Sequence, residues 1–303
     1  MTPIYNQLLI PFLTAMVVAI TMGGSGTAPA FSASYGANVM RKSLIPGLFG
    51  IMVFVGAFLA GKKTASTMGS GILPAEYMDF TVVSIALFSI AVTMLISNIS
   101  GIPQSTSQAA VLALAAPALY FGRLDTHNLF IEIIPAWFIL PIISYFLSFF
   151  AGKYIYQPMR RRGLTIQRAQ NENKRHIWDI VLVIMALYVS FAIGSNNVAN
   201  AAGPLYTMTI NELHIRESDH IVILMLATLV VAPCFGIGAS LFGHKILKNT
   251  GKEIILFGKF EAVIIAFISG SLLLLASVVK GIPTSLVQVN VAAILGIGVA
   301  KMG

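Results

Sequence analysis

Four short clusters of glycine, hydroxyl and amide residues stand out in the sequence, because such residues can hold an anion without carrying a charge. Each cluster is of the kind that starts a helix, where the first four backbone N–H groups lack intrahelical partners and the dipole end is positive. Converging helix starts would form an anion site, which glycines would let the backbone approach closely. The candidate binding residues are Ser25, Gly26, Thr27, Ser105, Thr106, Ser107, Gln108, Asn196, Asn197, Asn200, Thr284, Ser285 and Gln288.

None of these clusters contains Lys or Arg. An oxyanion held by neutral dipoles loses less to charge desolvation than one held by an isolated buried cation, and it can leave again. N-capping alone explains any single cluster, because Ser, Thr and Asn are common at helix starts. Four clusters that recur in pairs favour the binding interpretation.

The composition predicts that these clusters lie in a membrane. Of the 303 residues, 57% are hydrophobic and 10% are charged, whereas soluble domains carry about 25% charged residues. Apolar runs of roughly twenty residues are long enough to cross a bilayer as helices. We therefore expect an all-α polytopic membrane protein with segments near 7–22, 44–61, 78–97, 128–151, 177–193, 219–243 and 254–278.

Four shorter pieces at 24–40, 101–120, 196–210 and 281–300 predict discontinuous helices. The stretch 177–210 would be about 50 Å long as one helix, which is too long for one crossing, so it is expected to break around 194–197. Ordinary loops followed by short helices are the alternative. The single cysteine, Cys234, excludes an intrachain disulfide, and the N-terminal segment lacks the basic start of a signal peptide and is expected to be retained.

The net charge of +8 is best explained by membrane orientation rather than by nucleic-acid binding, because most basic residues lie between apolar segments. The polar stretch 152–176 holds seven Lys and Arg residues against one acid and is expected to be cytoplasmic in a cell inner (plasma) membrane. If successive membrane crossings alternate in direction from this stretch, Lys245, Lys248 and Lys252 lie on the cytoplasmic side. Lys62, Lys63 and Lys280 then fall outside.

The two sides of the basic stretch resemble each other. Residues 23–26 correspond to 194–197, residues 56–63 to 238–245, and residues 101–108 (GIPQSTSQ) to 281–288 (GIPTSLVQ). The three matches occur in the same order in both halves. The first half begins outside and the second inside, so the repeats are predicted to be inverted around a substrate site near the bilayer midplane. The expected organisation is a first repeat at 1–151, a cytoplasmic linker at 152–176 and a second repeat at 177–303 that is one helix short.

These motifs resemble those of the inorganic phosphate transporter (PiT) family, whose halves each carry G-A-N-D-x-A-N-A followed by G-x-P-x-S-T-T-H. Residues 194–201 (GSNNVANA) match the first signature at most positions, residues 101–108 match the second well, and residues 281–288 match it in part. The resemblance covers about residues 10–300. It implies an inverted-repeat secondary transporter of oxyanions.

The chain departs from the family pattern at the acids and at the histidines. Gly26 and Asn197 stand where the signature has Asp, and Gln108 and Gln288 stand where it has His. The segment GGSGTAPAFSASYG is more similar to the sulfate permease branch of the family. A carboxylate would accept the proton that phosphate retains but would repel fully ionised sulfate, so its loss favours a proton-free dianion and weakens the case for a sodium site.

We therefore expect a sulfate importer that works as a proton symporter, since moving a dianion against a negative-inside potential requires co-transported positive charge. Glu261 is the candidate for proton coupling, because an intramembrane carboxylate is functional by default. Phosphate transport is the alternative within this class, and a passive anion channel or a membrane enzyme represents a different class. No cofactor or metal is expected, and the expected partners are the oxyanion, the proton, the lipid bilayer and, left open, a second copy in a homodimer.

Overall fold

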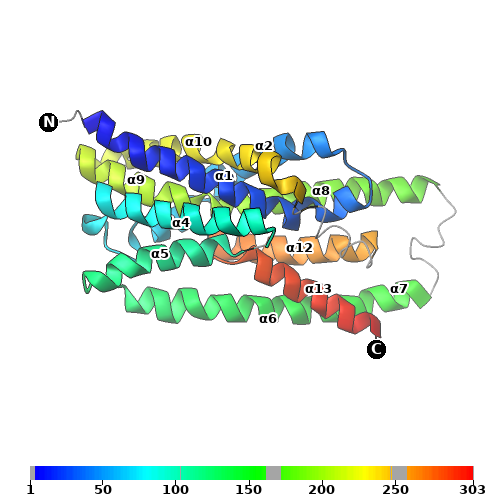
Figure 1. Cartoon of the computed structure of the whole chain (residues 1–303). Coiled ribbons are helices and arrows are strands. Elements are labelled where there is room, and N and C mark those ends of the chain that lie inside the picture. Colours follow the sequence, from blue (N-terminus) through cyan, green and yellow to red (C-terminus); the bar gives the residue numbers. More distant parts are fainter. Residues whose placement is uncertain (1–3, 103, 162–171, 246, 248–257, 303) are drawn as a thin grey trace.

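The computed structural model describes residues 4–102, 104–161, 172–245, 247 and 258–302, and within this part the chain is helical with no strand. The long helices lie side by side as one bundle (Figure 1). Seven stretches are long and apolar enough to span a membrane: Leu8–Gly36, Lys42–Ala60, Phe80–Ser100, Asn128–Met159, Ile177–Leu213, Glu217–Gly243 and Lys259–Lys280. The predicted all-α, multi-pass class is confirmed.

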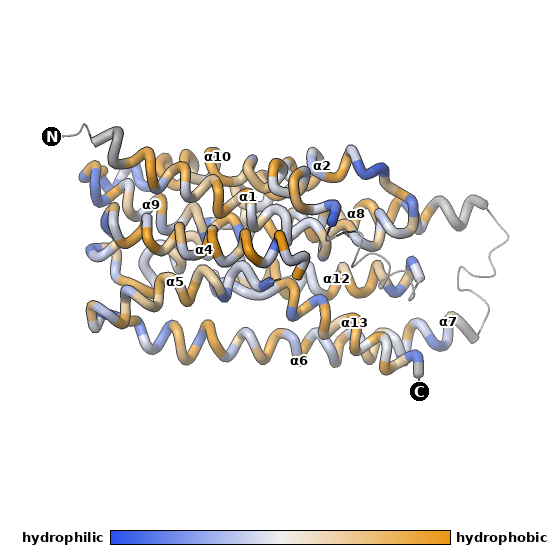
Figure 2. Tube along the Cα trace, viewed as in Figure 1, coloured by the Kyte–Doolittle hydropathy of each residue, from blue (hydrophilic) through white to orange (hydrophobic). Residues whose placement is uncertain are grey.

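The surface of the bundle fits a lipid environment. Hydrophobic residues cover most of the helix lengths, and hydrophilic residues gather at the two ends (Figure 2). Large apolar side chains such as Ile85, Phe88 and Phe138 are more than 60% exposed on the isolated chain. A surface of this kind is stable only when lipid covers it.

The first predicted helix break is absent. Helix α1 runs without interruption from Ile4 to Gly36, so the prediction of separate pieces at 7–22 and 24–40 is wrong. The glycines at its centre serve packing: a Cβ on Gly23 would lie 2.2 Å from the carbonyl oxygen of Phe235 in α10 (His220–Gly238). Small residues let two membrane helices approach this closely.

The second predicted break is present but very short. Helix α8 (Glu172–Asn197) is followed by Val198 alone and then by α9 (Ala199–Leu213). Val198 keeps helical dihedrals and gives α9 no side-chain cap. The predicted interruption around 194–197 is therefore displaced to Val198.

Two helical hairpins enter the bundle from opposite ends (Figure 1). In the first, α4 (Phe80–Ser100) leads through Gly101 to α5 (Thr106–Tyr120). In the second, α12 (Lys259–Leu275) continues as the π-helical η8 (Ala276–Lys280) and leads through Gly281 to α13 (Leu286–Met302). The short helices predicted within 101–120 and 281–300 are confirmed, although Pro103 of the first motif lies outside the described residues.

The same close contact occurs twice between the two halves of the chain. A Cβ on Gly56 in α2 (Ile45–Ala60) would lie 2.0 Å from the carbonyl oxygen of Phe191 in α8. A Cβ on Gly238 in α10 would lie 1.8 Å from the carbonyl oxygen of Ile20 in α1. Each contact joins a helix of one half to a helix of the other, so the halves interlock.

Helix α6 covers the second hairpin. It spans Ile134–Ala151, follows the π-helical η3 (Asn128–Ile133) and continues through η4 (Gly152–Tyr156) into α7 (Gln157–Arg161). Trp137 Nε1 donates to the carbonyl of Pro283 at 2.9 Å, and Ser144 donates to the carbonyl of Val289 at 2.8 Å. The polar linker predicted from 152 is thus helical at its start, and its part at 162–171 lies outside the described residues.

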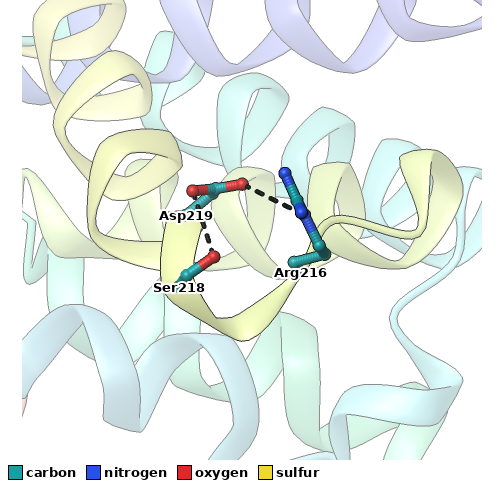
Figure 3. A network of polar contacts seen from close by, with 3 residues as sticks. All are labelled: Arg216, Ser218 and Asp219. Atoms are coloured by element: carbon teal, nitrogen blue, oxygen red, sulfur yellow. Dashed lines mark hydrogen bonds and ion pairs between the residues drawn. The ribbon is translucent and has the colours of Figure 1, made fainter.

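Charged side chains pair at the helix ends. Between α9 and α10, Arg216 pairs with Asp219 at 3.8 Å, and Ser218 donates to the same carboxyl group at 3.2 Å (Figure 3). Both partners of this pair are at least half exposed. An exposed pair of this kind contributes little to stability. The predicted cytoplasmic Lys248 and Lys252 lie outside the described residues.

Candidate functional site

The site begins at the starts of α5 and α13, which have the same local structure. Ser105 Oγ accepts the backbone N–H of Gln108 at 3.3 Å, and Ser285 Oγ accepts the backbone N–H of Gln288 at 3.3 Å. These caps satisfy one of the free N–H groups at each helix start and leave others available. Of the four predicted helix starts, these two are confirmed as capped starts.

A glycine makes each start possible. Gly101 has φ 73° and ψ 22°, and Gly281 has φ 69° and ψ 25°. This left-handed conformation ends α4 at Gly101 and ends η8, the continuation of α12, at Gly281. It is strained for residues with a side chain. The GIP motifs therefore encode the turn that reverses the chain inside the bundle.

The two helix starts meet through their glutamines. Gln108 Nε2 donates to Gln288 Oε1 at 3.1 Å, which joins residues 180 positions apart. Two of the four helix starts that the sequence suggested would converge therefore meet, and the positive ends of these two helix dipoles face a common region.

Asn196 links α8 to both hairpins. Its Oδ1 accepts Ser107 Oγ at 3.2 Å and the backbone N–H of Thr284 at 3.0 Å. Its Nδ2 donates to Ser277 Oγ at 2.8 Å and to the carbonyl of Ile282 at 3.0 Å. Asn196 is fully buried and uses its whole hydrogen-bonding capacity within the protein, so it shapes the site rather than offering a free donor.

Asn197 and Asn200 have capacity left over. Asn200 Nδ2 donates to Ser107 Oγ at 3.3 Å, but the Oδ1 atoms of Asn197 and Asn200 are buried with no hydrogen-bond partner. Buried polar atoms are almost always paired in proteins, so an unpaired one needs an explanation. Rotation of an amide exchanges its oxygen and nitrogen, so these groups can offer a ligand either acceptors or donors.

Ser25, Gly26 and Thr27 do not join this cluster through hydrogen bonds. They lie inside α1, where Ser25 Oγ donates to the carbonyl of Met22 at 3.1 Å and Thr27 Oγ1 donates to the carbonyl of Gly23 at 2.7 Å. A Cβ on Gly26 would lie 3.2 Å from the ring of Phe49. The prediction that this cluster starts a helix is wrong, because hydroxyls inside a helix bond back to their own carbonyls and free no N–H group.

The cluster is electrically neutral. Among the described residues, no hydrogen bond joins a candidate side chain to Lys, Arg, Asp or Glu, and no group of three or more His, Cys, Asp or Glu could hold a metal ion. Thr106 is buried at the start of α5, next to Ser107. The arrangement can surround a small anion with hydroxyl, amide and backbone donors.

Glu261 lies far from this cluster. It is 3% exposed in the first turn of α12, about 24 Å along the helix from Ser277 at 1.5 Å per residue. Its Oε1 accepts Lys301 Nζ at 2.7 Å. On another face of α12, Lys259 pairs with Asp179 of α8. Local sequence spacing does not reveal either pair, since their partners lie 40 and 80 residues apart along the chain.

Comparison with known proteins identifies the family. A profile of the "Phosphate transporter family" matches residues 22–303. The chain is 31% identical over 298 residues to "Sulfate permease CysP" of Bacillus subtilis, which covers 97% of this chain and 78% of the relative. It is 26% identical over 301 residues to a "Probable low-affinity inorganic phosphate transporter" of the same organism, covering 96% and 87%.

A solved structure has the same fold. "The sodium-dependent phosphate transporter" superposes with a TM-score of 0.83 at 20% identity, covering 98% of this chain and 90% of that one. These relatives are transporters or permeases rather than enzymes. The profile match and the relative at 31% identity show that this chain belongs to the phosphate transporter family, as a multi-pass membrane transporter.

Proposed function

We propose that the chain imports sulfate, bound where the starts of α5 and α13 meet the α8–α9 junction. The observation that carries this proposal is the pair of buried, unpartnered Oδ1 atoms of Asn197 and Asn200, in the α8–α9 stretch that Asn196 and Asn200 join to the two hairpins. Ser107, which bonds to both Asn196 and Asn200, lies at the centre of the same group. A bound sulfate would accept hydrogen bonds from these amides once each amide turns its Nδ2 toward the anion.

The absence of an acid from this cluster favours sulfate. At a separation of 4 Å and an effective dielectric of 20, a carboxylate would repel each unit of anion charge by about 4 kcal/mol. Asn197 occupies the position where the family signature has Asp, and its neutral amide avoids this repulsion. The 31% identity to a protein named sulfate permease supports the same choice.

Phosphate is the second candidate, and one observation favours it. The unpartnered Oδ1 atoms of Asn197 and Asn200 are acceptors that a protonated phosphate oxygen can satisfy directly. Other relatives carry phosphate in their names.

Transport is proposed to follow from two inverted repeats, 1–151 and 177–303, joined by a cytoplasmic linker in the plasma membrane. The recurring contacts of Gly56 and Gly238 and the matched turns at Gly101 and Gly281 support this organisation. A site between two such hairpins can be exposed to either side when the repeats move relative to each other. Proton symport is the proposed coupling, since each charge moved against 100 mV costs about 2.3 kcal/mol.

Competition binding tests the substrate assignment. The purified wild type and the Asn197→Asp variant are titrated with sulfate and phosphate, after a thermal melt has shown that both are folded. We expect the wild type to prefer sulfate, and the variant to lose sulfate binding while its phosphate-to-sulfate affinity ratio rises. A wild type that prefers phosphate, or a ratio that does not change, would contradict the sulfate assignment.

A further inference from the structure

Two lysines make the same long-range contact on the two hairpins. Lys63, at the start of α3 (Lys62–Ser70), donates from Nζ to the carbonyl of Val279 at 3.1 Å. Lys245, just after η7 (Ala239–Gly243), donates from Nζ to the carbonyl of Ile99 at 2.6 Å. The two lysines occupy matching positions in the segments 56–63 and 238–245.

The two acceptors also correspond. Ile99 precedes Gly101 by two residues, and Val279 precedes Gly281 by two residues. Each carbonyl thus belongs to the last turn of the first helix of its hairpin, two residues before the left-handed glycine. Lys63 of the first half bonds the hairpin of the second half, and Lys245 of the second half bonds the hairpin of the first.

Both contacts lie close to the candidate site. The backbone of Lys63 packs against Gly281, where an added Cβ would lie 2.8 Å from the Lys63 carbonyl oxygen. Gly281 is three residues before Thr284, whose N–H bonds Asn196. On the other hairpin, Ile99 is six residues before Ser105, the cap of α5.

The electrostatics of a hairpin explain why a cation is needed at this place. Each hairpin brings two helix ends together. The start of its second helix, α5 or α13, carries roughly +0.5 charge, and the end of its first helix, α4 or η8, carries roughly −0.5. For an anion, these two ends largely cancel. An ammonium group bonded to the last carbonyls neutralises the negative end and leaves the positive start of α5 or α13 unopposed.

Lys280 does not have this role although it lies at the same turn. Its Nζ lies 3.6 Å from Glu132, and its counterpart in the first hairpin is Ser100. Lys62 is exposed beside Lys63 and makes no hydrogen bond within the described residues. Lys42 is likewise exposed and without such a bond. Lys62 and Lys42 therefore serve as matched controls.

We infer that Lys63 and Lys245 are a matched pair of positioning residues, each of which raises anion affinity by neutralising the negative helix end of the opposite hairpin. This inference rests on the proposed function of the site. It adds two cations to an anion site whose own side chains are neutral, and it places them outside the direct contact with the ligand.

The test varies charge at one position in a folded protein. Lys63→Cys is purified in a Cys234→Ala background, which removes the one native cysteine. The thiol is then converted to an aminoethyl disulfide (positive), a methyl disulfide (neutral) or a sulfonatoethyl disulfide (negative). Lys245→Cys is treated in the same way, with Lys62→Cys and Lys42→Cys as controls.

Equilibrium binding of sulfate and of phosphate is measured for each adduct. We expect the neutral adducts at 63 and 245 to raise the Kd by roughly 2- to 5-fold, the range for surface charges at helix ends. The positive adduct should restore most of the affinity, and the negative adduct should weaken binding further. The adducts at 62 and 42 should change the Kd less than twofold.

Two outcomes separate this inference from the proposed function. If the wild type binds an anion but all three adducts at 63 and at 245 bind it equally, the lysines are structural and the inference is wrong. If the wild type binds neither sulfate nor phosphate, the proposed function fails, and the inference that rests on it fails with it. A Kd that depends on the charge of the adduct at 63 and 245, but not at 62 and 42, supports the inference.

Discussion

Individual side chains at the α5–α8–α13 junction divide into those whose hydrogen-bonding atoms are filled by protein groups and those with an atom left unpaired. Ser107 also has its one O–H filled by a protein group, because it donates to Asn196 while its oxygen accepts from Asn200. Asn196 has every hydrogen-bonding position filled by protein groups. Asn200 has an unfilled acceptor. This division predicts different consequences for similar substitutions.

Bound sulfate would have to take over the O–H of Ser107 from Asn196, so Ser107→Ala should weaken sulfate binding by about 1.5–3 kcal/mol, the scale of a hydrogen bond to a charged group. The matched control is Ser190→Ala, because Ser190 is also fully buried in a helix but, within the described part of the chain, its hydroxyl bonds only the carbonyl of Ala186. Calorimetric titration gives the affinities, and thermal melts give the stabilities. Normal binding by a Ser107→Ala protein that melts early would remove Ser107 from the site.

Asn196→Ala and Asn200→Ala should differ in which property they lose. Removal of Asn196 leaves buried partners unsatisfied, including the N–H of Thr284, and should cost about 2–3 kcal/mol of folding stability. Removal of Asn200 breaks one bond, so we expect a small stability loss of about 1 kcal/mol with a clear loss of anion affinity. Denaturation and binding curves on both variants check this, and the reverse pattern would contradict the assignment.

At the scale of helices, the fold depends on a few backbone approaches that only glycine permits. Gly238 and Gly56 sit against carbonyl oxygens of α1 and α8. Such contacts replace the hydrophobic driving force, which is weak between helices in lipid.

Gly238→Ala or Gly56→Ala should therefore destabilise the protein by at least about 1–3 kcal/mol through overpacking. Gly47→Ala is the control, because nothing lies within 4 Å of a Cβ at that position of α2. It should be neutral or slightly stabilising, by up to about 1 kcal/mol. Melting temperatures of the three variants in detergent make the comparison, and equal losses at all three glycines would refute the packing argument.

Sequence patterns predicted the helices that begin after a true turn, but they did not separate a cluster that starts a helix from one inside a helix. Gly101 and Gly281 each precede a serine cap and mark real starts. Gly23 and Gly26 lie within the continuous helix α1. Their lack of a side chain lets Phe235 and Phe49 pack closely against that helix. The contacts of Lys63 and Lys245 span 216 and 146 residues, so they cannot be predicted from the local spacing of residues.

The whole molecule brings together two hairpins from opposite ends, the proposed anion site between them and a largely buried ion pair at one end. Glu261 and Lys301 join the two arms of the second hairpin, at the end remote from its turn. The role of Glu261 in proton coupling stays a prediction. The ion pair changes how that prediction must be tested, because loss of the carboxylate also leaves a mostly buried ammonium group.

Glu261→Gln should retain sulfate exchange and lose accumulation driven by a proton gradient. The control is Glu261→Gln with Lys301→Met, which also removes the ammonium group that pairs with the carboxylate. Both variants should fail to accumulate sulfate if the carboxylate carries the proton. Recovery of accumulation in the double variant would show that Glu261 serves only to hold the pair together.

Sulfate uptake into proteoliposomes tests the central claim, that this chain is a gradient-driven oxyanion transporter, most directly. Radiolabelled sulfate is supplied with and without an inward proton gradient or sodium gradient, and it is challenged with unlabelled phosphate, molybdate and thiosulfate. We predict accumulation above equilibrium that requires the proton gradient, collapses with an uncoupler and resists phosphate. Uptake that only equilibrates would indicate a channel, and accumulation that requires sodium and is blocked by phosphate would contradict the sulfate–proton account.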